Sequence, residues 1–333
     1  MMTNNNFYIE PFSPMVGVKN GYAQSIAASF LRPTHGLTFQ RERLDTPDGD
    51  FLDIDLPSVP GITIDAAAPC VLALHGLEGS AQRGYMQELY RQLAERGIRA
   101  VGLNFRSCSG EMNRTTRFYH AGATDDVAFA LRWLAQRYPD APLGLVGFSL
   151  GANATLKYVG ENGRFLSAAV AISPPFDLMA GSQILRRLAG RLLGQHFLDS
   201  LFAKVEAKAT TLAGHVDVAD VLAARDLWQF DERLTAPLHG FHSAMDYYLQ
   251  NSSGRFLADV RVPTLLLRAL DDPLFSVADI PFATIHANPY LHLALTEHGG
   301  HVGFWEHTTH KNGHSPWWAE RQAARFLAQQ LHA

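Results

Sequence analysis

A serine stands between two glycines in the segment Gly-Phe-Ser-Leu-Gly at residues 147–151. The segment follows an apolar run, Leu143 to Val146, and precedes a helical pattern at residues 152–158. Small residues at such a strand-to-helix junction allow a sharp, strained turn, which lifts the serine hydroxyl above the edge of a sheet. We therefore predict that Ser149 is a nucleophile rather than an incidental turn residue.

An acidic turn later in the chain offers the carboxylate that a serine nucleophile needs. A serine hydroxyl is weakly nucleophilic at neutral pH, so an imidazole must accept its proton and a carboxylate must orient that imidazole. After the apolar run at residues 264–267 come Asp271, Asp272 and Pro273. We favour Asp272, because a proline commonly follows the acid in folds built around this nucleophile turn. Asp271 stays open as the alternative, although a turn role suits it better.

The candidate base lies in a glycine-containing loop after the last apolar run. His298 and His301 both occur there, and the neighbouring glycines allow the loop to bring one imidazole close to the serine. We predict His301 as the base, because it lies between Gly300 and Val302, well beyond the end of the strand. His298 is assigned a structural hydrogen bond. The chain order serine, acid, histidine is the one that this type of nucleophile turn requires.

Two backbone N–H groups are candidates for stabilising the negative charge that develops on a substrate carbonyl oxygen. Leu150 follows the nucleophile at the positive end of a predicted helix. Leu77 lies in the loop His-Gly-Leu-Glu-Gly-Ser at residues 75–80, directly after a predicted strand. We predict that both form an oxyanion hole, and that His75 and Glu78 shape the loop rather than take part in catalysis.

Other residue types invite different chemistry. The histidine series could suggest a metal site, and its members are His298, His301, His307, His310 and His314. Their spacing matches neither HExxH nor a Cys-x-x-Cys pair combined with histidine, and no acidic cluster accompanies them. We therefore expect no metal and no cofactor. Cys108 is an alternative nucleophile without an obvious histidine partner, so a buried or loop cysteine is expected there.

The elements that must position these residues alternate between strand and helix patterns. Helical spacing runs from Val127 to Tyr138, and Ser315 with Pro316 predicts the start of a last helix. Near-continuous apolar runs indicate strands buried on both faces, as in a parallel sheet; they lie at residues 71–74, 100–103, 143–146, 168–172, 264–267 and 291–295. The alternation predicts an α/β fold with a mostly parallel, doubly wound sheet.

Two parts of the chain fall outside this alternation. Residues 38–56 predict an antiparallel hairpin, turned at Asp48 and Gly49, that forms one edge of the sheet. Between Pro174 and Asp259 there are only helical windows, such as 182–193 and 218–228, which predict a helical cap insertion over the carboxyl edge of the sheet. The predicted domains are an N-terminal extension (1–37), the first part of the core (38–173), the cap (174–259) and the second part of the core (260–333).

Composition limits the classes of protein and partner. The chain has 333 residues, 47% hydrophobic and 18% charged, which is enough apolar material for one large core with an insertion. The formal net charge is −4 and basic residues are scattered, so nucleic acid is not expected as a partner. We see neither a signal peptide nor an apolar run of about 18 residues. With only Cys70 and Cys108, a reducing, cytoplasmic location is the expectation.

Several of these segments together resemble one family, the YheT-like branch of the α/β hydrolases, which also includes eukaryotic abhydrolase-domain proteins related to monoacylglycerol lipases and phospholipases. The matching segments follow one another in the expected order, at residues 75–80, 104–111, 113–114, 119–122, 147–151, 271–273 and 298–304. The resemblance implies the α/β-hydrolase fold and an esterase-like hydrolase with catalytic Ser149, Asp272 and His301.

Two positions depart from the pattern of that family. Ser107 stands where the family usually has glycine, which predicts an altered loop beside the pocket. Tyr22 stands where a histidine is usual, so no role of that N-terminal histidine is expected in this chain. Neither position belongs to the predicted triad.

The residues together predict hydrolysis of a carboxylic ester through an acyl-enzyme intermediate. The apolar composition of the cap favours a short or medium acyl chain on a small-molecule or lipid-like ester. An acyltransferase would use the same triad with an acceptor other than water. A non-catalytic ligand-binding protein of this fold would have no chemical need for all three groups.

Overall fold

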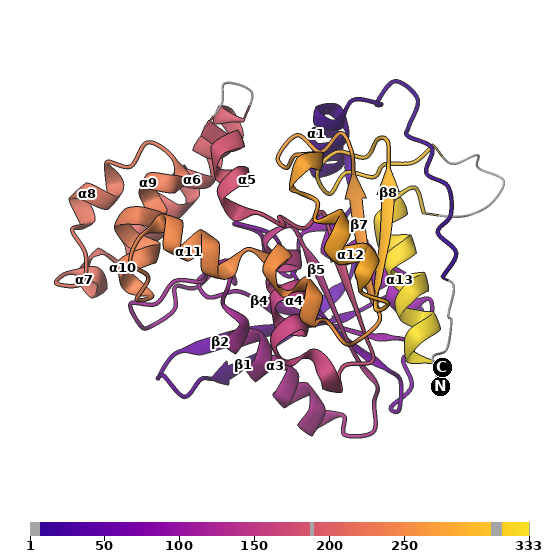
Figure 1. Cartoon of the computed structure of the whole chain (residues 1–333). Helices are drawn as coiled ribbons and strands as arrows, with labels where there is room; N and C mark the ends of the chain where they lie inside the picture. The colour runs from indigo at the N-terminus through magenta and orange to yellow at the C-terminus, as the bar shows by residue number, and fades with distance from the viewer. Residues whose placement is uncertain (1–6, 187–189, 308–314, 333) are drawn as a thin grey trace.

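A mixed sheet forms the middle of the molecule (Figure 1). The computed structural model describes residues 7–186, 190–307 and 315–332. Within these residues the sheet has eight strands in the order β1-β2-β4-β3-β5-β6-β7-β8. The strands are β1 (Thr38–Asp45), β2 (Phe51–Ser58), β3 (Cys70–Leu74), β4 (Arg99–Asn104), β5 (Leu143–Phe148), β6 (Ala168–Ile172), β7 (Thr264–Ala269) and β8 (Leu291–Thr296). Strands β3 to β8 are parallel, which confirms the predicted mostly parallel α/β sheet.

The hairpin at the start of the sheet is antiparallel, as predicted. Strand β1 pairs with β2, and β2 pairs with β4 in the antiparallel sense. The turn between β1 and β2 is closed by the N–H of Gly49, which donates to the carbonyl oxygen of Thr46 at 3.0 Å. Gly49 has a φ of 79°, a conformation that glycine adopts without steric cost. The hairpin leaves β1 as the outer strand at this end of the sheet.

The last predicted strand differs from the others in its burial. Strands β3, β5, β6 and β7 are buried along their whole length and β4 is buried except at Arg99, whereas β8 mixes buried, partly buried and exposed residues. The prediction that residues 291–295 are buried on both faces is therefore wrong. The physical reason is position, because β8 has β7 on one side only and lies at the edge of the sheet.

Helices cover both faces of the sheet, as a doubly wound arrangement requires. Leu145 and Val146 of β5 point to opposite faces; Leu145 shares a buried cluster with Leu131, and Val146 shares another with Phe326. The helices of the core are α2 (Gly84–Ala94), α3 (Thr124–Arg137), α4 (Leu150–Asn162), α12 (Phe282–Ala287) and α13 (Trp318–Leu331), with the 3₁₀ turns η1 (Gly163–Phe165) and η4 (Val277–Asp279).

The last helix begins two residues later than the sequence predicted. Helix α13 starts at Trp318, and Ser315 does not cap it. The Ser315 hydroxyl instead donates to Glu88 at 2.6 Å, and the carbonyl oxygen of Pro316 accepts from the N–H of Glu306. These contacts hold residues 315–317 in an extended segment beside the core. A prediction from Ser315 and Pro316 alone cannot include them, because their partners are distant in sequence.

Between β6 and β7 the described chain is helical, as predicted, and the helices from residue 191 to 251 lie to one side of the sheet (Figure 1). The window 218–228 divides at Asp226, whose side chain caps a new helix. The window 182–193 also divides, because one helix ends at Arg186 and the next begins at Arg191. The elements are α5 (Leu178–Arg186), α6 (Arg191–Ala207), α7 (Ala209–Leu212), α8 (Val218–Leu222), α9 (Leu227–Phe230), the π-helical turn η2 (Asp231–Thr235), α10 (Ala236–Leu238), α11 (Ala244–Asn251) and η3 (Ser253–Asp259).

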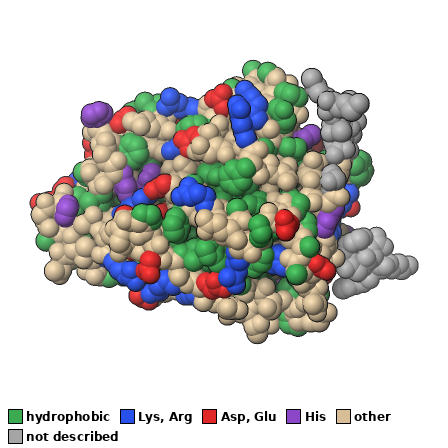
Figure 2. Space-filling model, turned by 90° about the horizontal axis from the view of Figure 1, so that it is seen from below, with side chains coloured by type: hydrophobic (Ala, Val, Ile, Leu, Met, Phe, Trp, Pro, Cys, Tyr) green, Lys and Arg blue, Asp and Glu red, His purple; other side chains and the backbone are tan. Residues whose placement is uncertain are grey.

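One further helix precedes the sheet. Helix α1 (Gly21–Leu31) lies beside the carboxyl ends of β7 and β8 (Figure 1), where the backbone of Asp271 comes close to Gly21. None of the helices in the described ranges combines the length and apolarity needed to cross a bilayer. On the face of the molecule in Figure 2, basic and acidic side chains lie interspersed.

Candidate active site

The turn at Ser149 joins β5 to α4 in a strained conformation. Ser149 has a φ of 53° and a ψ of −116°, in a region that non-glycine residues rarely adopt. The two flanking glycines make the turn possible. A Cβ on Gly147 would lie 2.1 Å from the carbonyl oxygen of Gly151, and a Cβ on Gly151 would lie 2.5 Å from that of Leu74. The segment therefore packs backbone against backbone and holds the serine between β5 and its helix.

A chain of hydrogen bonds links Ser149 to an imidazole and a carboxylate. The Ser149 Oγ lies 2.8 Å from Nε2 of His301, and Nδ1 of His301 lies 2.9 Å from Oδ2 of Asp272. The imidazole side chain is 12% exposed and the carboxylate is fully buried. With a proton on Nδ1, His301 donates to Asp272 and can accept the serine proton at Nε2. The three side chains thus have the geometry of a nucleophile, its base and the acid that orients the base.

A buried arginine reinforces the carboxylate of this chain. Arg268 Nη1 donates to Oδ2 of Asp272 at 2.8 Å, and the N–H of Leu274 donates to Oδ1 at 2.8 Å. Burial by itself would raise the pKa of Asp272, but the charges of His301 and Arg268 outweigh it and hold that pKa below its usual value. Arg268 was not among the predicted site residues. The one available signal was a cationic residue at the end of an otherwise apolar strand.

Asp271 makes different contacts from its neighbour. Its Oδ1 accepts the N–H of Gly300 at 2.8 Å, and its Oδ2 lies 3.4 Å from Nδ1 of His298. Asp271 and His298 therefore brace the loop that carries His301. Of the two aspartates left open by the sequence, the structure brings Asp272, and not Asp271, against the His301 imidazole.

Helix α1 holds the histidine loop from the other side. The Ser25 hydroxyl accepts the N–H of His301 at 2.8 Å, while the Gln24 side chain bonds both backbone groups of Trp305. A Cβ on Gly300 would lie 2.2 Å from the carbonyl oxygen of Gly21, so helix and loop touch through their backbones. Residues 1–37 were predicted to be an N-terminal extension without a role in the site. The only signal in this segment was Tyr22, one of the two departures from the family pattern.

The loop at residues 75–80 reaches the nucleophile. A Cβ on Gly76 would lie 3.4 Å from the Cβ of Ser149, which is ordinary van der Waals contact. Across the described ranges, the N–H groups of Leu77 and Leu150 donate no hydrogen bond to another protein group. Both residues are partly buried, and Leu150 directly follows the serine.

His75 and Glu78 fix the shape of this loop. His75 Nδ1 donates to the carbonyl oxygen of Gly76 at 2.7 Å, and its Nε2 accepts the N–H of Phe105 at 3.1 Å. Both ring nitrogens are therefore occupied, and burial lowers the pKa of His75 to about 4, which keeps the ring neutral. Glu78 accepts from the Tyr119 hydroxyl at 2.6 Å and from Lys204 of α6 at 2.7 Å. His75 therefore ties the loop to the core, and Glu78 ties it to Lys204 of the helical insertion.

Cys108 does not contact a histidine in the described part of the chain. Its Sγ lies 3.2 Å from Nζ of Lys204, and the side chain is buried. Burial raises the pKa of the Cys108 thiol to about 11, so the thiolate needed for nucleophilic attack is scarce at neutral pH.

The departure from the family pattern at Ser107 has a conformational explanation. Ser107 has a φ of 62°, which glycine adopts at less cost than serine. The serine gains a compensating contact, since its hydroxyl donates to Oδ1 of Asn113 at 2.6 Å and accepts the N–H of Asn113 at 3.1 Å. The loop thus keeps the left-handed turn that glycine would otherwise supply. Tyr22, the other departure, lies exposed on α1.

Only His298, His301 and His307 of the histidine series lie among the described residues. No group of three or more His, Cys, Asp or Glu side chains suited to a metal ion occurs among the described residues. His298 and His301 have the partners given above, and the backbone N–H of His307 donates to Ser13. His310 and His314 lie outside the described residues.

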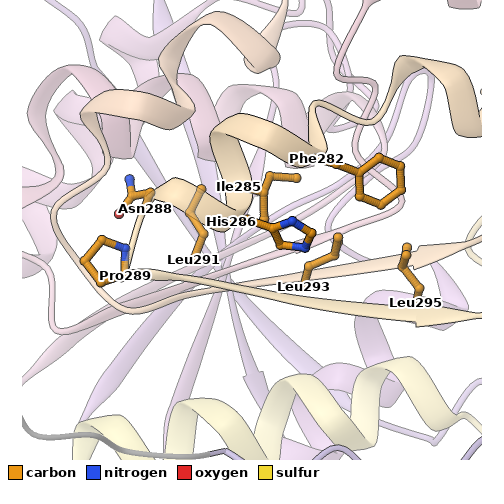
Figure 3. Close-up of a pocket in the computed structure, with 8 residues that line it drawn as sticks. All are labelled: Phe282, Ile285, His286, Asn288, Pro289, Leu291, Leu293 and Leu295. Atoms are coloured by element: carbon orange, nitrogen blue, oxygen red, sulfur yellow. The ribbon is translucent and has the colours of Figure 1, made fainter.

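A separate hollow of about 420 Å³ lies between α12 and β8 (Figure 3). Leu291, Leu293 and Leu295 form a row along the strand, and Phe282 and Ile285 extend toward them from the helix. Its lining includes none of the three side chains of the Ser149 hydrogen-bond chain. It is a feature of the sheet edge rather than of the candidate active site.

Comparison with known proteins agrees with this architecture. Residues 69–308 match the family described as alpha/beta hydrolase fold. The chain is 35% identical over 326 residues to YheT of Escherichia coli K12, an esterase by inference, with 97% of this chain and 94% of that protein covered. It is 30% identical to the mouse phospholipase ABHD3, with 89% and 74% covered. A monoacylglycerol lipase of Saccharomyces cerevisiae is also 30% identical, with 81% and 61% covered.

Solved structures resemble the fold as well. An esterase of Pyrococcus furiosus, Pf2001, superposes with a TM-score of 0.57 at 17% identity, covering 97% of this chain and 99% of that one. At this identity the likeness concerns the fold alone. The matches in sequence confirm the resemblance to the YheT-like branch that the motifs indicated.

Proposed function

Since the chain belongs to the α/β-hydrolase fold family, we propose that it is a serine esterase that hydrolyses a carboxylic ester through an acyl-enzyme intermediate. The observation that carries the proposal is the hydrogen-bond chain from Ser149 through His301 to Asp272. The names of its relatives, an inferred esterase, a phospholipase and a monoacylglycerol lipase, all describe enzymes that cleave esters.

The first half of the reaction transfers the acyl group to the enzyme. The Oγ of Ser149 attacks the acyl carbon as its proton moves to Nε2 of His301, and Asp272 stabilises the imidazolium that forms. The N–H groups of Leu77 and Leu150 hold the oxyanion of the tetrahedral intermediate. When that intermediate collapses, the leaving alcohol takes the proton from His301. Ser149 then carries the acyl group as an ester.

The second half releases the acid. His301 takes a proton from a water molecule, whose oxygen attacks the acyl carbon of the acyl-enzyme. Collapse of the second tetrahedral intermediate returns the proton to Ser149 and frees the carboxylic acid. No metal or cofactor takes part in either half.

We further propose that residues 174–259 act as a cap, with an apolar acyl site beneath them. Leu150 packs against a buried cluster that contains Tyr247 and Tyr248 of α11. Trp228, Phe241 and Met179 pack against the same cluster, so the cluster that Leu150 joins is aromatic and aliphatic. Lys204 of α6 binds Glu78 next to Leu77, which ties the cap to the predicted oxyanion loop. Such surroundings suit a short or medium acyl chain.

A fluorophosphonate reagent combined with a set of p-nitrophenyl esters tests the proposal. We expect the wild-type protein and Ser29→Ala to be labelled and Ser149→Ala to remain unlabelled, since Ser29 lies exposed on α1. Hydrolysis should be fastest for short or medium chains. Absence of labelling in the wild-type protein would favour the non-catalytic binding protein. Transfer of the acyl group to an added alcohol in preference to water would favour the acyltransferase.

A further inference from the structure

Helix α1 has its bulky apolar side chains on the wrong face for a helix packed on a protein core. Its buried positions are Gly21, Gln24 and Ala28. Tyr22, Ile26 and Phe30 recur every four residues on the other face and are 42%, 58% and 83% exposed. A surface helix normally turns its apolar face inward. This helix turns small and polar groups inward and large apolar groups toward solvent.

Exposed apolar residues also occur before the helix and at its last position. Val16 before it and Leu31 at its last position are 72% and 60% exposed. We call Val16, Tyr22, Ile26, Phe30 and Leu31 the α1 stripe. A row of exposed apolar side chains of this kind marks a site of interaction, because its exposure to water is unfavourable.

The charges along the sequence on both sides of the stripe favour one kind of contact surface. Although the chain has 32 acidic residues, none occurs between Glu10 and Glu42, and α1 itself has no charged side chain. Lys19 precedes the helix and is exposed. A helix with an apolar outer face, a basic residue at its start and no acidic neighbour in sequence is complementary to a phospholipid surface that contains anionic head groups.

The position of the stripe relates it to the candidate active site. Ser25, on the inner side of the same helix, accepts the N–H of His301, and Asp271 borders Gly21. The helix therefore lies between solvent and the loop that carries the proposed base. A surface bound to the stripe would lie next to that loop, where an ester embedded in lipid is close to its catalytic groups.

We propose that the α1 stripe docks the protein on a phospholipid surface, so that the ester substrate is an amphiphile taken from that surface. The docking itself depends only on the stripe, whereas the identity of the substrate rests on the proposed esterase function.

Flotation with vesicles of phosphatidylcholine and phosphatidylglycerol tests the docking. We expect the wild-type protein and Ser149→Ala to float with the vesicles, since binding needs no catalysis. Ile26→Gln and Phe30→Gln should each weaken vesicle binding about tenfold, as expected for losing the burial of one large apolar side chain. Phe165→Gln is the matched control, because Phe165 is 49% exposed in η1, away from α1.

The outcomes separate the docking from the esterase proposal. Fluorophosphonate labelling should be equal in the wild type, Ile26→Gln, Phe30→Gln and the control, which also shows that the variants fold. A labelled wild-type protein that does not float, or α1 variants that float as well as the control, would overturn the docking. If light scattering finds a wild-type dimer that the α1 variants abolish, a second copy covers the stripe and the docking is wrong. If the wild-type protein floats with the vesicles but is not labelled, only the proposed esterase function is contradicted.

Discussion

The hydroxyl of Ser25 accepts the backbone N–H of His301 at 2.8 Å, although 276 residues separate the two in the chain. The same hydroxyl donates to the carbonyl oxygen of Gly21 one turn earlier, at 2.7 Å. Ser25 thus connects the first helix of the protein to the loop that carries the proposed base. This loop includes Val302 and Phe304 at positive φ, so its shape depends on such external contacts.

Replacement of Ser25 by alanine should lower kcat with little change in KM. The His301 N–H loses its acceptor, which costs about 1–3 kcal/mol for a buried donor and loosens the imidazole relative to Ser149. Steady-state kinetics with a p-nitrophenyl ester measures the effect, expected to be about tenfold. Ser29→Ala is the control, because Ser29 also donates to the carbonyl four residues earlier but is exposed and touches no loop residue. An equal loss in both variants would show that Ser25 acts through helix stability alone.

The two neighbouring aspartates should differ strongly in their effect on activity. Asp272→Asn leaves His301 without the carboxylate that fixes its tautomer, so kcat should fall by about 10⁴. Asp271→Asn weakens a brace at Gly300 and His298 and should cost about tenfold or less. Steady-state kinetics of both variants, with circular dichroism to check folding, makes the comparison. The assignment of Asp272 is wrong if Asp271→Asn is the more damaging change.

Loss of Arg268 should make the protein unfold at higher pH on acidification. The pKa of Asp272 lies below its usual value of 3.8, so its ionised form stabilises the fold above that pH and this contribution is lost as pH falls through the lower, folded-state pKa. Arg268→Leu removes one of the charges that lower this pKa. The folded-state pKa then rises, and the acid midpoint should move up by on the order of one pH unit.

Acid titrations followed by circular dichroism measure that midpoint. Arg261→Leu serves as the control, since the Arg261 side chain contacts only carbonyl oxygens near the surface. Identical midpoints for Arg268→Leu and the wild type would rule out the proposed contribution of Arg268 to the charge state of Asp272.

Lys204 of α6 and Lys208, directly after the end of that helix, should separate stability from catalysis. Lys204→Met removes the cation that binds Glu78 beside Leu77, so both the free energy of unfolding and kcat should fall. Lys208, one turn later, binds Asn113 and the carbonyl of Arg117 instead. Lys208→Met should therefore lower the free energy of unfolding by a similar amount, about 1–3 kcal/mol, and leave kcat near its wild-type value. Urea denaturation and steady-state kinetics supply the two readouts, and equal kcat values in both variants would argue against a link between Glu78 and the oxyanion loop.

Local patterns in the sequence were enough for the order of strands and helices in the core. Six apolar runs became β3 to β8, the turn at Asp48 and Gly49 closed the hairpin, and the segment 147–151 lay between a strand and a helix. These features depend on neighbours within a few residues, where side-chain period and the conformational freedom of glycine act directly. The predicted start of α13 was wrong because Glu306 and Glu88, which are distant in sequence, bind Pro316 and Ser315. The predicted burial of β8 was wrong because, among the described strands, β8 has a neighbour on one side only.

The sequence by itself predicted a serine in a strained turn, followed along the chain by an acid and a histidine in the order typical of this fold. Only the tertiary structure brought Asp272 rather than Asp271 to the imidazole, placed the buried Arg268 behind that carboxylate and set Ser25 against the loop of His301. Adjacent aspartates in a turn point in different directions, and a hydrogen bond requires two groups to meet within about 3 Å in a fixed orientation. Spacing along the chain does not predict these hydrogen bonds. They depend on how α1, β7 and the histidine loop pack together.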